Sequence, residues 1–230
     1  MRVVVPFAAE TPKTRLESVL TPAERGAISR AMLADVLSAI VGAGHEPRIV
    51  STAPLDLETL ELPSEVTAST SVTVDARPLT EAVNARLPGS GARDDMDDDP
   101  DAVAVVMADL ALATPDALEA LLSTDADVAI APGRGGGTNA LVVRHPEFFV
   151  DYHGCSYLDH REIAREVGAS LETIDSFRLA TDIDEPSDLV EVLVHGRETD
   201  RAPACLRGFG FELDDHDGRV AIARSDQVPK

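Results

Sequence analysis

Cysteine is scarce in this 230-residue sequence, and a long apolar stretch is absent. The two cysteines, Cys155 and Cys205, are too few for a disulfide framework or a thiolate zinc site. No apolar run is long enough to span a membrane, and the strand-like residues 1–6 are too short and wrongly flanked for a signal peptide. We therefore expect a cytoplasmic protein with no membrane partner.

Lysine is the other scarce residue type, because only Lys13 and Lys230 occur. Acidic residues outnumber basic ones by 41 to 20, which gives a formal net charge of −21. An acidic surface repels phosphate backbones, so nucleic acid is not an expected partner. Excess acid with almost no lysine is typical of a halophilic protein, since high salt screens the self-repulsion. An ordinary acidic mesophilic protein is the alternative.

The arrangement of apolar runs and capping signals predicts an α/β fold in a single domain over residues 1–230. Alternating strands and helices predict a mostly parallel, doubly wound sheet, which binds ligands beyond the carboxyl ends of its strands. The expected strands are 2–6, 48–51, 72–74, 102–107, 128–131, 140–144 and 170–174. The expected helices run from Pro22 to about Gly42, over 78–87, from Thr114 onward, and over 156–167 and 186–195.

Two segments depart from this alternation. Residues 89–101 are rich in Gly, Ser and Asp without periodicity, which predicts a solvated acidic loop insertion. Residues 205–224 predict a C-terminal hairpin, with strands at 208–213 and 219–223 around a turn.

The loop after the first strand carries Lys13 and Arg15 two residues apart. A strand-end loop with two cations beside a helix N-terminus is able to hold a triphosphate, because both side chains neutralise anionic oxygens. The loop is not a Walker motif, since the required glycines and the Gly-Lys-Ser/Thr ending are missing. A solvated loop that carries two basic residues is the alternative.

Three aspartates fall where a magnesium ion could be bound. Asp109 ends the buried strand 102–107, and Asp182 and Asp184 alternate in an extended segment, so that both point the same way. Carboxylate oxygens are suitable ligands for magnesium on a nucleotide phosphate. The alternatives are a turn aspartate at 109 and acids that favour the start of a helix at Pro186.

The glycine-rich segment 132–141 is a candidate anion site. Three adjacent glycines let the backbone approach an anion closely, and Arg134, Thr138 and Asn139 offer donors for phosphate or carboxylate. A strand rather than a helix follows, so the segment is not a dinucleotide-binding fingerprint. A flexible hairpin is the alternative.

The segment 151–160 contains histidines, acids and Cys155, which suggests a metal hydrolase or a cysteine nucleophile. Ser156, however, fits the N-cap of the following helix, and His160 lies four residues on in that helix. This spacing makes both side chains available to one anionic ligand and does not build a three-ligand metal site. We therefore disfavour both catalytic interpretations.

The ordered set of motifs resembles the 2-phospho-L-lactate guanylyltransferase family over roughly residues 1 to 224. The resemblance implies a Rossmann-like nucleotidyltransferase fold and a role in coenzyme F-420 biosynthesis. The first loop of that family often carries lysine where this chain has Ala8 and Ala9, which leaves the phosphate charge to Lys13 and Arg15. The matching motifs are Lys13-Thr14-Arg15-Leu16, Met107-Ala108-Asp109-Leu110, Gly135-Gly136-Gly137-Thr138-Asn139-Ala140-Leu141, Ser156 to His160, and Asp182-Ile183-Asp184-Glu185-Pro186.

The resemblance implies that GTP and 2-phospho-L-lactate react to give lactyl-2-diphospho-5′-guanosine and pyrophosphate. It assigns catalysis to Lys13, Arg15 and Asp109. It assigns the nucleotide to Pro6, Lys13, Arg15, Glu81, Asn84 and Asp109, the acceptor to Gly135, Gly136, Gly137, Thr138, Asn139, Gly154, Ser156 and His160, and Mg²⁺ to Asp109, Asp182 and Asp184. For Glu81 and Asn84 a polar helix face is the alternative.

Two other functions stay open from the sequence. The same chemistry could use phosphoenolpyruvate or a sugar phosphate as acceptor. A non-catalytic nucleotide-binding regulatory protein is a different class, but such a protein has no reason to retain costly clustered carboxylates. The sequence is compatible with a homodimer.

Overall fold

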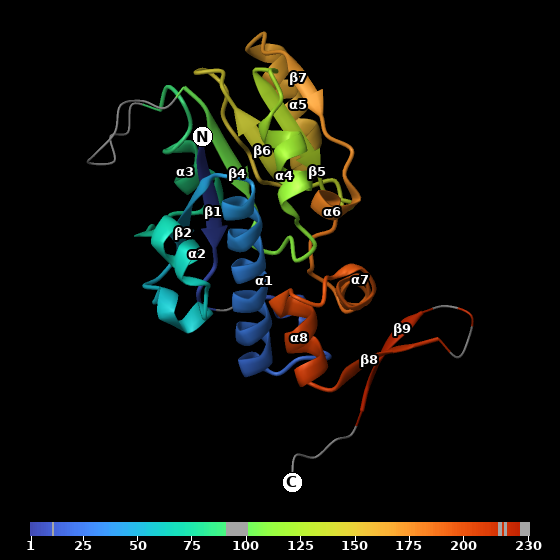
Figure 1. Cartoon of the computed structure of the whole chain (residues 1–230). Helices are drawn as coiled ribbons and strands as arrows, with labels where there is room; N and C mark the ends of the chain where they lie inside the picture. The colour runs from blue at the N-terminus through green and yellow to red at the C-terminus, as the bar shows by residue number, and fades with distance from the viewer. Residues whose placement is uncertain (11, 91–100, 216–217, 219, 226–230) are drawn as a thin grey trace.

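The computed structural model describes residues 1–10, 12–90, 101–215, 218 and 220–225. Most of the acidic loop predicted at 89–101 lies outside these residues. The described chain forms a seven-stranded sheet in the order β3-β2-β1-β4-β6-β5-β7 and a separate two-stranded hairpin (Figure 1). The strands are β1 (Arg2–Phe7), β2 (Glu46–Ser51), β3 (Ser71–Val74), β4 (Val103–Val106), β5 (Val128–Pro132), β6 (Thr138–Val143), β7 (Leu171–Thr173), β8 (Phe211–Asp214) and β9 (Ala221–Arg224).

All pairings within the seven-stranded sheet are parallel except those of β6, which runs antiparallel to β4 and β5. β6 follows β5 after the short segment 133–137, and so short a connection returns the chain antiparallel. The prediction of an α/β fold with a mostly parallel sheet is confirmed. Strand β6 begins at Thr138, two residues before the predicted start at 140.

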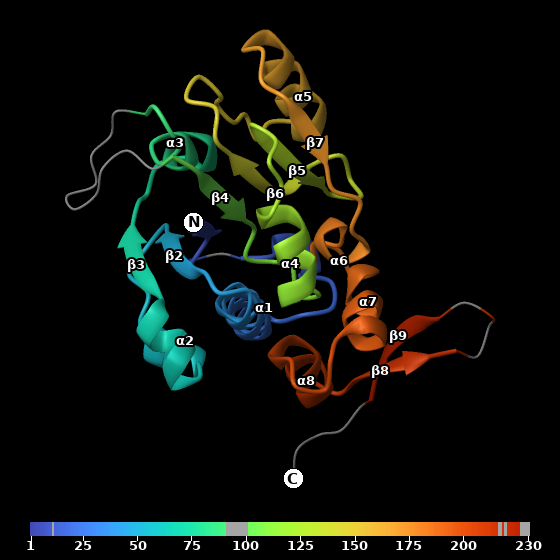
Figure 2. The same ribbon diagram turned by 45° about the horizontal axis from the view of Figure 1, so that its top comes forward.

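Helices cover both faces of this sheet (Figures 1 and 2). Side chains of α1 and α4 pack on one face, and those of α3 and α5 pack on the other. The helices are α1 (Pro22–Gly42), α2 (Ser64–Ser69), α3 (Leu79–Asn84), α4 (Pro115–Leu122), α5 (Ser156–Glu166), α6 (Phe177–Ala180), α7 (Asp188–His195) and α8 (Arg201–Gly208), with 3₁₀ turns η1 (Thr14–Leu16) and η2 (Leu57–Leu60).

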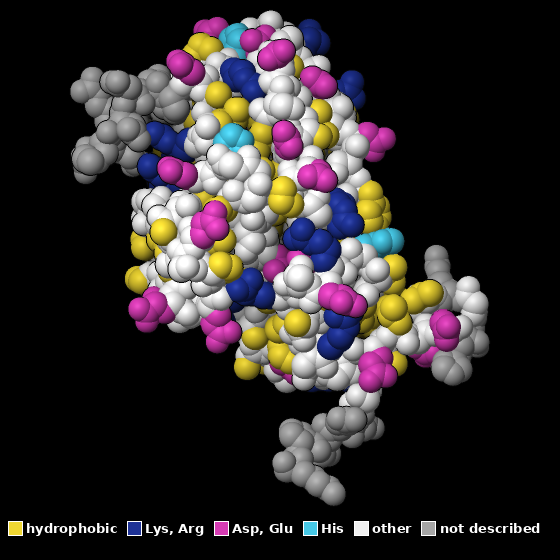
Figure 3. Space-filling model, viewed as in Figure 1, with side chains coloured by type: hydrophobic (Ala, Val, Ile, Leu, Met, Phe, Trp, Pro, Cys, Tyr) yellow, Lys and Arg dark blue, Asp and Glu magenta, His cyan; other side chains and the backbone are white. Residues whose placement is uncertain are grey.

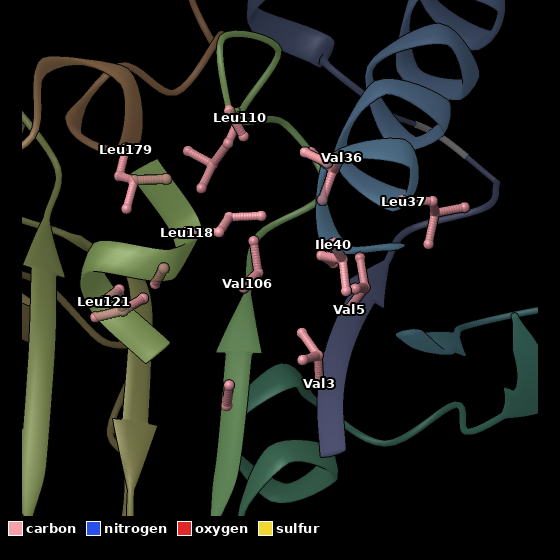
Figure 4. Packing of buried hydrophobic residues seen from close by; sticks show 14 of the residues in the cluster. Val3, Val5, Val36, Leu37, Ile40, Val106, Leu110, Leu118, Leu121 and Leu179 are labelled. Carbon is pink, nitrogen blue, oxygen red and sulfur yellow. The ribbon is translucent and has the colours of Figure 1, made fainter. Parts of the chain in front are cut away.

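Helix α1 forms where its sequence signals place it. The Thr21 hydroxyl accepts a hydrogen bond from the Glu24 amide, and the Glu24 carboxylate accepts one from the Thr21 amide, which completes a capping box before Pro22. The buried side of the helix packs against β1 and β4 (Figure 4). This packing fixes the carboxyl ends of the two strands relative to each other.

The C-terminal region packs as a third cluster around α7, α8 and the first half of α1. Asp35 of α1 accepts hydrogen bonds from the Arg201 and Ala202 amides, both at 2.8 Å, and thereby caps α8 from another helix. Strands β8 and β9 leave this cluster as a projecting hairpin (Figures 1 and 2), in which Phe211 is buried at the base and Leu213 is exposed.

Several sequence expectations need correction. The hairpin begins at Phe211, because residues up to Gly208 complete α8, a helix that lacks a long apolar run and was not predicted. Helices α2 and α6 were also not predicted, since both are short. Cys155 rather than Ser156 is the N-cap of α5, and Ser156 is the first helical residue.

In the part of the chain that the structure describes, no helix combines the length and apolarity needed to cross a bilayer. On the face drawn in Figure 3, acidic side chains are spread over the whole surface rather than gathered in one patch. The negative charge is therefore a property of the general surface there, and the site has to be identified from its geometry.

Candidate active site

A cavity of about 320 Å³ lies at the carboxyl ends of β1, β2, β3 and β4. This is the edge at which the sequence predicts a ligand site, since parallel strands present their ends to one crevice. Its lining residues are Pro6, Phe7, Ala8, Pro12, Lys13, Ser29, Val50, Thr52, Asp75, Arg77, Leu79, Ala82, Val83, Met107, Ala108, Asp109 and Asp184.

Lys13 is the central cation of this cavity. Its Nζ lies 2.7 Å from Asp109 Oδ2 and 2.7 Å from Asp184 Oδ1. The backbone of Lys13 is left-handed, with φ 56° and ψ 47°, a conformation that is strained for a residue with a Cβ. The two ion pairs hold the side chain in place despite that strain, and they join residues far apart in the sequence.

Arg15 follows at the outer side of the same cluster. Its Nη1 lies 3.3 Å from Asp184 Oδ2, and its side chain is largely exposed. Lys13 is almost fully buried instead, so the two predicted cations differ in environment. Burial alone would lower the pKa of Lys13, but the charges of Asp109 and Asp184 outweigh burial and raise it. The ammonium therefore stays charged.

Asp109 is the least satisfied polar group of the site. Burial raises the pKa of this carboxyl, and the Lys13 ammonium opposes that shift. Oδ2 binds Lys13, whereas Oδ1 is buried and has no hydrogen-bond partner among the described residues. An unpaired buried carboxylate oxygen is costly in the absence of a ligand. The orphaned oxygen thus fits a cation or a donor that arrives with a substrate.

Asp182 joins the cluster through Asn139. Asn139 Nδ2 donates to Asp182 Oδ1 at 3.0 Å and to the Leu179 carbonyl at 3.0 Å. Asp182 and Asp184 also line a second cavity of about 310 Å³, together with Arg15 and Arg134. The alternate acids therefore face a common space, as their spacing predicts.

The three aspartates predicted to bind magnesium have suitable donor atoms, but they are not gathered around one point in this structure. Across residues 1–10, 12–90, 101–215, 218 and 220–225, no three His, Cys, Asp or Glu side chains are close enough together to hold a metal ion. Asp109 and Asp184 instead share the Lys13 ammonium, and Asp182 is held by Asn139. The hard oxygen donors and the orphaned Oδ1 of Asp109 suit magnesium. The three-aspartate magnesium site stays a prediction.

The acceptor residues predicted in β6 and α5 are hydrogen-bonded to one another. Thr138 Oγ1 lies 2.9 Å from His160 Nδ1, and His160 Nε2 accepts the Asp151 amide at 3.0 Å. Because Nε2 accepts, Nδ1 carries the proton and donates to Thr138. Burial lowers the pKa of His160 to about 4, so the imidazole is neutral at neutral pH. These side chains thus join β6 to α5.

The glycine segment bends onto the start of α5. Gly136 has φ +84°, and a Cβ there would lie 2.8 Å from Cys155 Sγ, so glycine is required. The Gly136 carbonyl accepts the Tyr157 amide at 3.1 Å. Gly135 borders the second cavity, and Gly137 accepts the Gly133 amide at 2.9 Å. The segment is therefore an ordered turn rather than a flexible hairpin.

The remaining predicted residues lie in different surroundings. Pro6 lines the first cavity, whereas Glu81 and Asn84 do not. Both ends of the Asn84 amide bind the Val150 backbone, at 2.9 and 2.8 Å. Ser156 is buried at the start of α5, and Gly154 has φ +60° just before it. Roles for these residues in binding stay predictions.

The cavity also contains four polar residues that the sequence analysis did not single out: Ser29, Thr52, Asp75 and Arg77. Asp75 directly follows β3, and Arg77 comes three residues after the end of β3, as Asp109 comes three residues after the end of β4. The rule that ligands bind beyond strand ends could have identified them. The strand itself was predicted at 72–74, but no motif marked the residues that follow it.

Comparisons with known proteins agree with this arrangement. A family model described as "Guanylyl transferase CofC like" matches residues 1–225. A 2-phospho-L-lactate guanylyltransferase of Haloterrigena turkmenica is 72% identical over 227 residues, covering 99% of this chain and 98% of that protein. Proteins of the same name from Natrialba magadii and Methanosphaerula palustris are 60% and 44% identical, covering 97% and 96% of this chain and 99% and 97% of theirs.

Solved structures support the fold at low sequence identity. A candidate nucleotide-diphospho-sugar transferase from Desulfovibrio desulfuricans has a TM-score of 0.68 at 18% identity and covers 90% of this chain and 94% of its own. A nucleotidyl transferase from Methanothermobacter has a TM-score of 0.52 at 16% identity, covering 90% and 98%. The expected Rossmann-like nucleotidyltransferase fold is confirmed.

Proposed function

Because the chain belongs to the CofC-like guanylyl transferase family, we propose that it transfers GMP from GTP to 2-phospho-L-lactate and releases pyrophosphate. The observation that carries this proposal is the 72% identity to a 2-phospho-L-lactate guanylyltransferase over 99% of the chain. The Lys13–Asp109–Asp184 cluster at the end of the cavity supports it, because phosphoryl transfer depends on positioning and charge neutralisation.

The reaction is an in-line substitution at the α-phosphorus of GTP. An oxygen of the acceptor phosphate forms the new bond to phosphorus, and the bond to the bridging oxygen of the β-phosphate breaks, so pyrophosphate leaves with its charge. Lys13 and Arg15 would offset the charge that develops on the leaving group. Lys13 lines the cavity, so its ammonium can exchange carboxylate oxygens for phosphate oxygens.

We propose that Asp109, Asp182 and Asp184 hold magnesium when the nucleotide is bound. The buried, unpaired Oδ1 of Asp109 supports this assignment. The ion would supply electrophilic stabilisation of the phosphate oxygens. Asn139 keeps Asp182 oriented through the hydrogen bond at 3.0 Å, so its role is that of a positioning residue.

The acceptor is proposed to bind beside the glycine segment. Arg15 and Arg134 line the second cavity and offer guanidinium donors for the phosphate of the acceptor. The same cavity is lined by Asp182, Asp184, Glu185 and Asp188, so a cation bound to these carboxylates would be needed to offset their charge. The side chains of Thr138 and His160 hold each other at the base of this segment. They would therefore shape the acceptor site from below.

Three further properties belong to the same proposal. The product would enter coenzyme F-420 biosynthesis in the cytoplasm, and a homodimer stays compatible with the sequence.

We also expect adaptation to high salt, given the charge of −21. Activity should be lost below roughly molar salt, where the Debye length exceeds about 3 Å. Activity measured from 0.1 to 3 M KCl tests this, and full activity at the lowest concentration would contradict it.

The decisive experiment is an acceptor panel with GTP and Mg²⁺ at high salt. Pyrophosphate release is measured with 2-phospho-L-lactate, phosphoenolpyruvate and a sugar phosphate as separate acceptors. We expect the fastest release with 2-phospho-L-lactate. Faster release with another acceptor would change the substrate assignment, and binding of GTP without release for any acceptor would favour the regulatory alternative.

A further inference from the structure

Arg77 lines the cavity at the end that lies away from Lys13 and Asp109, where the phosphates are proposed to bind. Asp75 and Arg77 follow β3, whereas Asp109 follows β4. β2 and β1 lie between these strands, so the strand ends are separated by three strand spacings, roughly 14 Å. An extended nucleotide can bridge that distance. With the phosphates at Lys13, the base would therefore lie toward Asp75 and Arg77.

Asp75 holds the guanidinium of Arg77 in a fixed orientation. Arg77 Nε lies 2.9 Å from Asp75 Oδ1, and Arg77 Nη2 lies 2.6 Å from Oδ2. The buried Arg86 donates to Asp75 Oδ2 at 2.6 Å and to the Ala82 carbonyl at 2.6 Å. Arg86 thus holds the Asp75 carboxylate in place, and the carboxylate accepts two hydrogen bonds from the guanidinium of Arg77. These bonds fix the plane of that guanidinium.

The two residues of this pair differ in what they can offer a base. The side chain of Asp75 is 8% exposed and its oxygens already accept four hydrogen bonds from Arg77 and Arg86. The side chain of Arg77 is 49% exposed and borders the cavity. Asp75 is therefore a positioning residue, and Arg77 is the group that can touch a ligand.

The chemistry of the site selects among bases. A guanidinium has donors and no acceptor. Guanine presents two adjacent acceptors, O6 and N7, on one edge, and arginine binds them in a bidentate manner. Adenine presents an amino donor in place of O6, and pyrimidines have no N7. Val50, Leu79 and Ala82 supply apolar walls for a purine ring.

We propose that Arg77, which Asp75 positions through Nε and Nη2, presents the Nη1/Nη2 end of its guanidinium to the O6/N7 edge of guanine and selects GTP over ATP. This inference rests on the proposed function and identifies the residue that sets its base specificity. It assigns base reading to Arg77 in place of the weaker candidates Glu81 and Asn84, because neither of them lines the cavity and the Asn84 amide binds the Val150 backbone.

The test measures binding of four nucleotides to the full chain with Mg²⁺ at high salt, by calorimetry. ITP keeps O6 and N7 but lacks the 2-amino group, 7-deaza-GTP lacks N7, and ATP lacks O6. Wild-type protein should bind GTP and ITP equally well, 7-deaza-GTP more weakly, and ATP on the order of 10- to 100-fold more weakly than GTP.

Two variants and a control assign this pattern to Arg77. Arg77→Met should weaken GTP binding on the order of 10- to 100-fold and leave ATP binding nearly unchanged, so the preference is lost. Arg77→Lys keeps the charge without the planar fork and should also lose the preference. Arg165→Met removes an exposed arginine that pairs with Glu162 on α5, so the preference should stay.

The inference is overturned if Arg77→Met keeps the wild-type ratio of GTP to ATP affinity. It is also overturned if ITP binds much more weakly than GTP while 7-deaza-GTP binds equally well, because the other edge of guanine would then be read. In both cases pyrophosphate release with GTP would still support the proposed function. Wild-type protein that neither binds nor turns over GTP would overturn the proposed function itself.

Discussion

The two halves of the site satisfy their polar groups in different ways. Over β1 to β4, the nucleotide half contains Asp109, whose Oδ1 has no partner among the described residues. Over β5, β6 and α5, the acceptor half contains Thr138, Asn139 and His160, which are buried and hydrogen-bonded within the protein. The first half thus has a charged oxygen that is open to a ligand. In the second half these three side chains are bound within the protein, and the orphaned group beside them is the neutral Tyr152 hydroxyl, which is buried without a partner among the described residues.

This difference indicates that the two halves have different roles, one in turnover and one in the stability of the fold. Unsatisfied buried charge is costly and persists where a ligand compensates for it, so the Lys13–Asp109–Asp184 cluster should carry the chemistry. Internally satisfied polar groups fix the shape of the segment that they support. We therefore expect changes in the nucleotide half to affect turnover and changes in the acceptor half to affect stability first.

The largest expected effect comes from neutralising the open half. Asp109→Asn removes the charge that faces Lys13 and should lower turnover by on the order of 10²- to 10³-fold. The amide is nearly isosteric, so the melting temperature should not fall. Pyrophosphate release and thermal unfolding measure the two effects. Asp116→Asn, at the exposed start of α4, is the matched control. Turnover of Asp109→Asn within twofold of wild type would remove Asp109 from the site.

The stability of the acceptor half should depend on pH through His160. Burial lowers the pKa of His160 to about 4, below its unfolded value of about 6.5. The unfolded state therefore binds more protons between these values, and the free energy of unfolding should fall by roughly 3 kcal/mol as the pH drops from 6.5 to 4. Denaturant unfolding across this range measures the slope.

His160→Gln removes the titrating group, so its free energy of unfolding should depend less on pH over the same range. His153→Gln changes an exposed histidine and is the matched control. Equal slopes in His160→Gln and wild-type protein would contradict the buried, neutral state of His160. The affinity for GTP should be unchanged in His160→Gln, which separates the two halves.

A smaller effect on stability is expected at Lys13. Lys13→Met leaves Asp109 and Asp184 without a shared counter-ion, at a cost of about 1–2 kcal/mol, since both carboxylates are partly exposed. Without the ammonium, the pKa of Asp109 rises further above its unfolded value, so the cost should grow as the pH rises from 4 to 7. Lys13→Arg restores a cation and should recover most of the loss. A difference from wild type that does not depend on pH would contradict the pairing.

Spacing and strand-end position predict where the site lies. Asp109 follows a buried apolar run, and Asp182 and Asp184 alternate in an extended segment, so their convergence on one edge could be predicted. The sharing of one ammonium by Asp109 and Asp184 could not, because it depends on the left-handed backbone of Lys13 and on contacts across 96 and 171 residues.

Contacts between residues far apart in the sequence also explain why the sequence indicated the residue types of the acceptor half but not their partners. Ser156, Thr138 and His160 have the side chains that bind anions, but the sequence does not show that Thr138 and His160 bind each other. Asp75 and Arg77 were missed although the strand before them was predicted at 72–74, because no motif marks these two residues in the sequence. Helix α8 escaped prediction because it lacks a long apolar run and because its first amides bind Asp35 of another helix rather than the side chain of its own N-cap residue, Asp200.

The most direct test of the central claim is water-proton relaxation with Mn²⁺ in place of Mg²⁺. We expect little enhancement with Mn²⁺ and wild-type protein alone, because the Lys13 ammonium already bridges Asp109 and Asp184, and strong enhancement when GTP is added. In Asp109→Asn the enhancement with GTP should be largely lost. Enhancement with GTP that is as strong in Asp109→Asn as in wild-type protein would contradict the claim that this cluster receives the metal–nucleotide complex.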